Sequence, residues 1–67
     1  MTKEEFREEV KSYIGPKNWR KGQTVFNYVD EKYGVARQVQ YVDNIDCFFD
    51  DSQIDAFLDA CYKRLEK

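Results

Sequence analysis

Large apolar side chains recur every three or four residues along most of this 67-residue chain, and this spacing limits the accessible folds more than any other feature. An α-helix returns to the same direction every 3.6 residues, so the spacing places these groups on one helical face. The most regular seam has spacings of 3, 4, 3 and 4 and comprises Trp19, Gly22, Phe26, Val29 and Tyr33. The pattern predicts an all-α fold.

Start and stop signals divide the pattern into three main helices and one short helix. The predicted main helices cover residues 3–14, 18–33 and 51–66, and the short helix lies near 35–41. A chain of this length forms one domain at most, here residues 1–67, and buries only about 60% of the surface that its unfolded form exposes. We therefore expect a small bundle of three main helices with the short helix between the second and the last.

The ends of the first two helices carry recognisable capping residues. Thr2 and Glu5 form a T-x-x-E capping box at the start of the first helix, and Gly15 is expected to end it as a left-handed stop. Asn18 is the expected N-cap of the second helix and Gly34 its left-handed stop. A glycine inside a helix costs about 1 kcal/mol relative to alanine, so we expect Gly22 to let a neighbouring group come close.

The last helix also has an entry signal. Asp50 and Gln53 fit a D-x-x-Q capping box, and Phe49 and Ile54 occupy the positions of a hydrophobic staple. The preceding turn carries Phe48 and Phe49, and both are expected to point inward. These signals predict a helix that packs its apolar stripe against the other two.

Composition argues against catalysis and against a resident cofactor. The chain has no histidine to act as a base or a common zinc ligand, and its only cysteines are Cys47 and Cys61. The amino terminus lacks the apolar region of a signal peptide, and no apolar run approaches the ~20 residues that span a bilayer. We therefore expect a cytoplasmic protein that is not an enzyme, holds no metal and keeps both cysteines reduced in its core.

Charge is distributed unevenly, with a net charge of −2 overall. Residues 1–34 hold seven cationic and six acidic side chains, whereas residues 35–67 hold four and seven. The basic corner, defined as Lys17, Trp19, Arg20 and Lys21, lies at the expected start of the second helix. Helix N-termini favour anions, so this corner is a candidate site for phosphate or a nucleic-acid backbone. The competing interpretations are that its cations pair with the protein's own aspartates or form a solvated surface.

Two further groups of polar residues are candidate contact surfaces. Asp51, Asp55 and Asp59 share one face of the last helix, where they form either a solvated surface or a docking site for a basic partner. A polar recognition strip at i, i+4 and i+7 flanks the apolar seam and comprises Gln23, Asn27 and Asp30. Alternatively, one of these two amides turns inward and satisfies backbone groups of the 43–49 turn.

Two motifs, R-x-G-Q-x-x-F-N and D-x-F-[YF]-[DN]-D-x-x-I-x-x-F, lie between residues 19 and 58. Their residues here are Arg20, Gly22, Gln23, Phe26 and Asn27, then Asp46, Phe48, Phe49, Asp50, Asp51, Ile54 and Phe57. With these motifs the chain resembles a family of small uncharacterised proteins of bacterial genomes and prophages. It departs from the family's pattern at Cys47, where relatives often have proline. The resemblance implies a small helical fold and a phage or mobile-element setting, and it assigns no catalytic or binding residue.

The pairing of the two motifs suggests that Arg20, Gln23 or Asn27 contacts the 46–51 segment. As a function, the sequence favours a small protein-binding or regulatory module with an unknown protein partner, as a monomer or a weak homodimer. The alternative is a nucleic-acid-associated helical domain that uses Lys17, Arg20 and Lys21, with Trp19 as an apolar or stacking contact.

Overall fold

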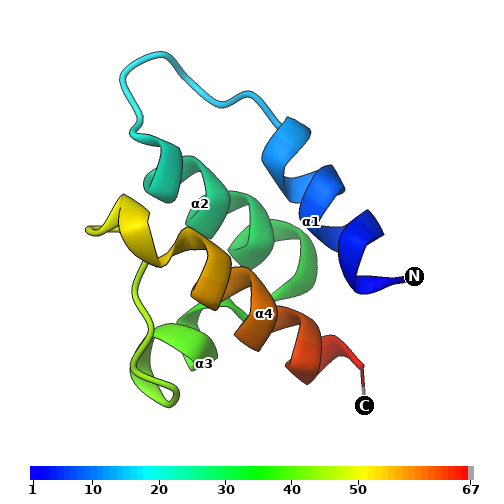
Figure 1. The fold of residues 1–67 in the computed structure, drawn as a ribbon. Helices are drawn as coiled ribbons and strands as arrows, with labels where there is room; N and C mark the ends of the chain where they lie inside the picture. The colour runs from blue at the N-terminus through cyan, green and yellow to red at the C-terminus, as the bar shows by residue number, and fades with distance from the viewer. Residues whose placement is uncertain (67) are drawn as a thin grey trace.

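The computed structural model describes residues 1–66, which fold into four α-helices without a strand. These are α1 (Lys3–Ser12), α2 (Lys21–Tyr33), α3 (Ala36–Tyr41) and α4 (Ile54–Leu65), the last entered through the 3-10 turn η1 (Asp51–Gln53). The predicted bundle of three main helices and one short helix is confirmed (Figure 1). No helix within residues 1–66 has both the length and the apolar character needed to cross a membrane.

The core forms where the apolar faces of all four helices meet. Helix α2 contacts α1, α3 and η1, and α4 contacts α1 and α3 (Figure 1). Phe26 lies near the centre, with its ring centroid 5.4 Å from that of Phe48 and 5.7 Å from that of Phe57. Burying such a side chain stabilises the fold by roughly 1.5–3 kcal/mol. The buried apolar residues are Phe6, Val10, Val25, Phe26, Val29, Ala36, Val39, Cys47, Ile54, Phe57, Leu58 and Cys61.

The capping box predicted for α1 is confirmed, but the predicted end of the helix is wrong. Tyr13 is already extended, with ψ of 132°, and Ile14 is 90% exposed. A longer helix is unfavourable because Pro16 has no N–H for the carbonyl of Ser12, and because a residue before proline avoids helical angles. Gly15 is not a left-handed stop. A Cβ atom there would lie within 3.1 Å of the side chains of Thr24 and Trp19, so this glycine allows the chain to cross close to α2.

Helix α2 begins three residues later than predicted. Residues 16–19 form a turn in which the Trp19 N–H donates to the Pro16 carbonyl at 3.0 Å, so Asn18 lies in the turn and is not the N-cap. Arg20 occupies the N-cap position and makes no side-chain cap. At the other end the prediction is confirmed, because Gly34 adopts a φ of 72° and its N–H donates to the last turn of α2.

The start of α2 is capped from a distant part of the chain. The Asp51 carboxylate accepts a hydrogen bond from the Gly22 N–H at 3.0 Å. A Cβ atom on Gly22 would lie 1.9 Å from the Cys47 carbonyl oxygen, and the Cys47 thiol donates to the Gly22 carbonyl at 3.4 Å. The expectation that Gly22 lets a neighbour come close is confirmed, and the neighbour is the backbone of the 46–51 segment.

The entry to α4 differs in detail from the predicted capping box. Asp50 accepts from the Ser52 N–H at 3.0 Å, whereas Gln53 turns back to accept from the Asp46 N–H at 3.2 Å. Phe48 is half-buried against Phe26, but Phe49 is 69% exposed. The expected staple and the inward orientation of Phe49 are therefore wrong. The tight 3-10 turn at 51–53 explains the difference, because it begins three residues before the regular helix and leads directly into Ile54.

Candidate functional site

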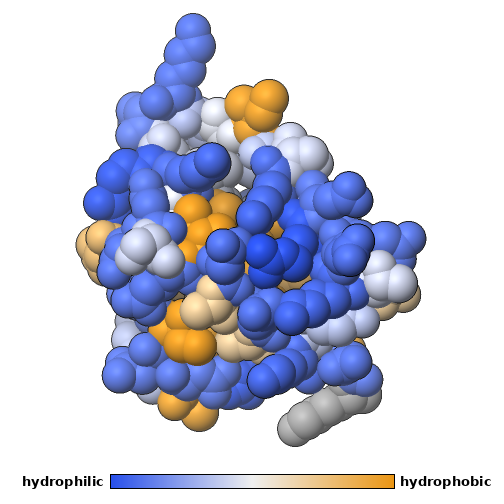
Figure 2. All heavy atoms as spheres, in the orientation of Figure 1, coloured by the Kyte–Doolittle hydropathy of each residue, from blue (hydrophilic) through white to orange (hydrophobic). Residues whose placement is uncertain are grey.

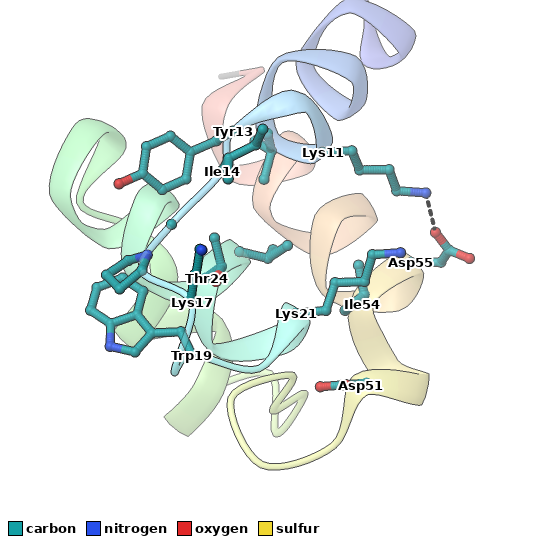
Figure 3. A pocket seen from close by; sticks show the side chains of 14 residues that line it. Lys11, Tyr13, Ile14, Lys17, Trp19, Lys21, Thr24, Asp51, Ile54 and Asp55 are labelled. Carbon is teal, nitrogen blue, oxygen red and sulfur yellow. Dashed lines mark hydrogen bonds and ion pairs between the residues drawn. The ribbon is translucent and has the colours of Figure 1, made fainter.

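A groove of about 700 Å³ opens between the end of α1, the α1–α2 connection (residues 13–20), the first turns of α2 and the start of α4 (Figure 3). Val10, Val25 and Ile54 line it from the core side. It is bordered by Ile14 and Trp19 of the connection. The groove exists because α1 ends early and the connection then leaves the helical layer. It is larger than two other hollows of the described residues, which measure about 350 and 540 Å³.

Lysines and aspartates of the groove have different environments. Lys11 donates to Asp55 at 3.0 Å, and Asp51 is engaged by the Gly22 N–H. Lys17 and Lys21 also line the groove, and neither makes an ion pair or side-chain hydrogen bond with any of residues 1–66 (Figure 3). The groove therefore offers two cations with no partner in that range, while both of its aspartates are engaged.

The predicted pairing of the basic corner with the protein's own aspartates is wrong. Within the described residues, Lys17, Arg20 and Lys21 make no ion pair. Arg20 instead donates from its guanidinium to the Phe48 carbonyl. This confirms that Arg20 contacts the 46–51 segment, but through a backbone oxygen. The reason is local, because the carboxylates of that segment already accept from backbone N–H groups, as Asp46 does from Phe48 at 2.9 Å.

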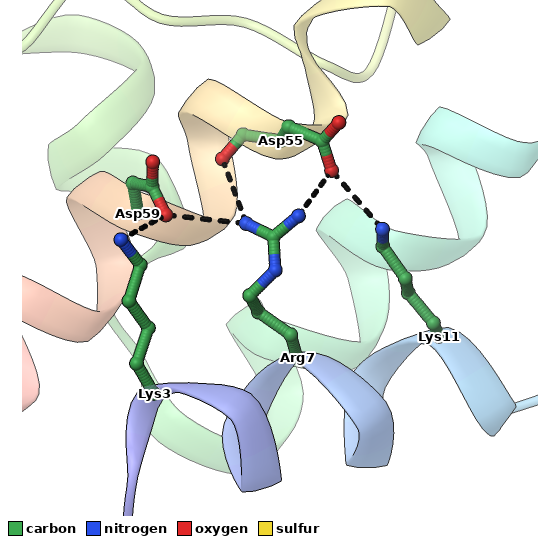
Figure 4. Close-up of polar contacts among 5 residues, drawn as sticks. All are labelled: Lys3, Arg7, Lys11, Asp55 and Asp59. Carbon is green, nitrogen blue, oxygen red and sulfur yellow. Dashed lines mark hydrogen bonds and ion pairs between the residues drawn. The ribbon is translucent and has the colours of Figure 1, made fainter.

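The acidic side chains of α4 lie against three cations of α1 (Figure 4). Arg7 reaches both Asp55 and Asp59, at 2.5 and 3.1 Å, and Lys11 and Lys3 complete the pairs at 3.0 and 2.9 Å. Hydrogen bonds from these cations lower the pKa of both carboxyls. Docking of a basic partner on this face stays a prediction, and the structure shows that Asp55 and Asp59 already pair with cations of α1. The sequence could not reveal this, because it does not say which face of α4 meets α1.

The amides of the polar strip do not satisfy the 43–49 turn. Gln23 and Asn27 are half-buried and make no side-chain hydrogen bond within residues 1–66. The inward-turned amide that satisfies the 43–49 turn belongs to Gln53, not to either of them. Asn27 lines a second hollow of about 350 Å³, together with Tyr13, Trp19, Tyr28, Glu31 and Lys32. Trp19 and Tyr13 line both hollows, so these two rings mark their border.

A polar cluster around Glu9 was not predicted. The Glu9 carboxylate accepts from Tyr28 at 2.6 Å, from Tyr33 at 2.8 Å and from the Lys32 ammonium. These hydrogen bonds, that of Lys32 first, lower the pKa of Glu9 to about 2. The Lys32 ammonium also lies 5.6 Å from the centroid of the Tyr28 ring. The spacing of Tyr28 and Lys32 at i and i+4 is the only sequence signal, and it does not identify the partner.

Neither cysteine is placed for nucleophilic chemistry. Cys47 and Cys61 are free and fully buried, and burial raises the pKa of each thiol to about 12. A thiol rather than a thiolate is then present at neutral pH, and only the thiolate is a strong nucleophile or metal ligand. Among the side chains of residues 1–66, no three cysteines or acids come together as a potential metal site.

The geometry brings only part of the predicted site together. Lys17, Trp19 and Lys21 border the groove, Arg20 is directed to Phe48, and Asn27 lies in the second hollow. Tyr13 and Ile14 fall within the helix predicted over residues 3–14, and the Gly15-Pro16 pair was the available signal that they lie outside it. Comparisons with known protein families, with curated proteins and with solved structures find no match. The resemblance to small bacterial and prophage proteins therefore stays a prediction.

Proposed function

We propose that this protein is a small, non-catalytic protein-binding module of the cytoplasm, and that the groove is its contact surface. One observation carries the proposal: Ile14 is 90% exposed at the border of a groove lined by apolar groups. Ile14 shares the lining with Tyr13, Pro16 and Trp19, and contiguous apolar surface of this kind is typical of interaction sites, whereas single exposed apolar residues are not. The bacterial or phage setting rests on the resemblance alone.

The connection that carries Ile14 is held in place from both sides, which favours a preformed site. The chain around Gly15 packs against Thr24, and Trp19 closes the turn by its hydrogen bond to Pro16. Pro16 itself has a fixed φ, which reduces the entropy lost on binding. Covering Ile14 and part of Trp19 would remove apolar area from water at roughly 25 cal/mol per Å².

Other large apolar residues are also exposed at the surface, among them Tyr41, Val42 and Phe49. Figure 2 shows apolar atoms as separate patches among hydrophilic ones, with one group protruding over the α1–α2 connection. Val42, at the end of α3, is 71% exposed and lines none of the hollows described above. Val42 therefore supplies a matched control for Ile14, because both are exposed β-branched residues outside regular helix.

The proposal is tested by photocrosslinking in cells of the source organism. A photoreactive residue at position 14 should crosslink one partner protein, and one at position 42 should not. Ile14→Asp should abolish the capture of that partner by the tagged chain, while Val42→Asp should retain it. Circular dichroism of both variants checks that they fold. Equal capture by Ile14→Asp and by the wild type would refute the groove as the contact surface.

The alternative function is nucleic-acid association through the basic corner. It is favoured by the absence of acidic partners for Lys17 and Lys21 within residues 1–66, on either side of Trp19 in the chain. Phosphate contacts make affinity fall steeply with salt, by a slope of about 0.9 per neutralised phosphate on a double-logarithmic scale. A steep salt dependence that disappears in Lys17→Gln/Lys21→Gln would support this alternative over protein binding.

A further inference from the structure

We propose that the occupant of the groove is an acidic, apolar segment of the partner protein, whose acidic residues lie against Lys17 and Lys21. This inference rests on the proposed function of the groove and specifies the chemistry of its partner. It follows from three features: the charges that line the groove, the apolar surface between them, and the single acid of the neighbouring hollow.

Charge complementarity identifies the sign of the partner. The chain as a whole carries −2, yet the groove is lined by Lys11, Lys17 and Lys21 against Asp51 and Asp55. Both aspartates are already engaged, one by the Gly22 N–H and the other by Arg7 and Lys11. The charges left for a ligand are positive. A basic segment would be repelled there, because like charges across an interface are unfavourable.

The apolar surface identifies a polypeptide rather than an ion. Ile14, Trp19 and Val25 line the same groove as the two lysines, so a ligand that contacts Lys17 or Lys21 lies next to apolar groups. Trp19 also lines the second hollow, where Glu31 is the only acid and Lys32 is engaged by Glu9. A segment that places an apolar side chain on Trp19 and directs its acidic side chains toward the two lysines, away from Glu31, is complementary to both hollows.

A nucleic-acid backbone fits this site less well. Arg20, the residue best suited to bidentate phosphate contacts, directs its guanidinium to the Phe48 carbonyl. That leaves Lys17 and Lys21, and two phosphate contacts give little of the affinity that nucleic-acid binding proteins derive from counterion release. Trp19 and Tyr13 of the same groove are rings of the kind that stack on bases, so a single-stranded oligonucleotide is a competing probe in the test below.

Trp19 reports directly on occupancy, because it is the only tryptophan of the chain and it lines the groove. The assay titrates the whole protein with three short peptides that share one leucine pattern and differ in their charged positions, which hold glutamate, glutamine or lysine. A single-stranded oligonucleotide is the fourth probe. We expect the glutamate peptide to shift the Trp19 emission and to bind about tenfold more tightly than the lysine peptide, with a difference that shrinks at high salt.

Charge reversal supplies the specific control. Lys17→Glu/Lys21→Glu should fold as the wild type does, because neither lysine has a partner within residues 1–66, and it should prefer the lysine peptide. Ile14→Asp should weaken the binding of all three peptides, and Val42→Asp should weaken the binding of none.

Wild-type binding that is equal for the three peptides and is lost in Ile14→Asp would overturn this inference but leave the groove as a protein-binding site. Tighter binding of the oligonucleotide would overturn it in favour of phosphate recognition. No response of Trp19 to any probe, together with unchanged partner capture by Ile14→Asp, would overturn both proposals.

Discussion

Replacing Gly22 with alanine separates two physical effects that have opposite signs at this position. In an isolated helix the substitution would stabilise by about 1 kcal/mol, because alanine has the higher helix propensity. In this fold the new Cβ atom would lie 1.9 Å from the Cys47 carbonyl oxygen, where ordinary contacts begin at 3.4 Å. The 46–51 segment or α2 must therefore move by about 1.5 Å.

The expected magnitude follows from the contacts that such a movement disturbs. Overpacking of this kind costs about 1–3 kcal/mol. The Gly22 N–H bond to Asp51 and the Cys47 thiol bond to the Gly22 carbonyl also weaken, which adds about 1 kcal/mol. After subtraction of the propensity gain, Gly22→Ala should destabilise by about 2 kcal/mol. A domain of this length has only about 3–10 kcal/mol of stability, so the loss is large.

The measurement is urea denaturation followed by circular dichroism, with the thermal midpoint as a second reading. The midpoint should fall by roughly 8–16 °C. Gly22→Ala in an Asp51→Ala background should still be destabilising, because the closest atom belongs to the Cys47 backbone and not to the Asp51 side chain. A Gly22→Ala protein as stable as the wild type, or more stable, would refute the close approach of the 46–51 segment to α2.

Two further substitutions test contacts that hold distant parts of the chain together. Asp51→Ala should lower the free energy of unfolding, measured by urea denaturation, by about 1 kcal/mol because it removes the cap of α2. Asp51→Asn should lower it less, because its amide oxygen can still accept from the Gly22 N–H. Equal losses in the two variants would argue against the cap. Glu9 has its pKa lowered from 4.5 to about 2, so its contribution to stability is present above pH 4.5 and is lost as the pH falls toward 2. The stability difference between wild type and Glu9→Gln should therefore shrink across that range, and a difference independent of pH would contradict the bonding of Glu9 by Lys32 and the two tyrosines.

The all-α fold could be predicted because it depends mainly on local information. Three signals each act over only a few residues of the chain: the apolar spacing, the capping box at Thr2 and the left-handed Gly34. The structure confirms all three. The boundaries were less accurate where two local signals competed. The apolar spacing extended the first helix through Tyr13 and Ile14, but the missing N–H of Pro16 ends it earlier.

The groove and the fate of each charged group depended on how the helices pack. Asp55 and Asp59 lie on one face of α4, as their spacing requires, but only the packed bundle decides that this face meets Arg7 and that Asp51, in η1, meets Gly22. Side-chain spacing reports direction around one helix axis and carries no information on which other helix lies there. For the same reason the sequence by itself determined the helices, whereas the tertiary structure alone decided that Lys17 and Lys21 lack acidic partners among residues 1–66 and that Ile14 stands beside an open groove.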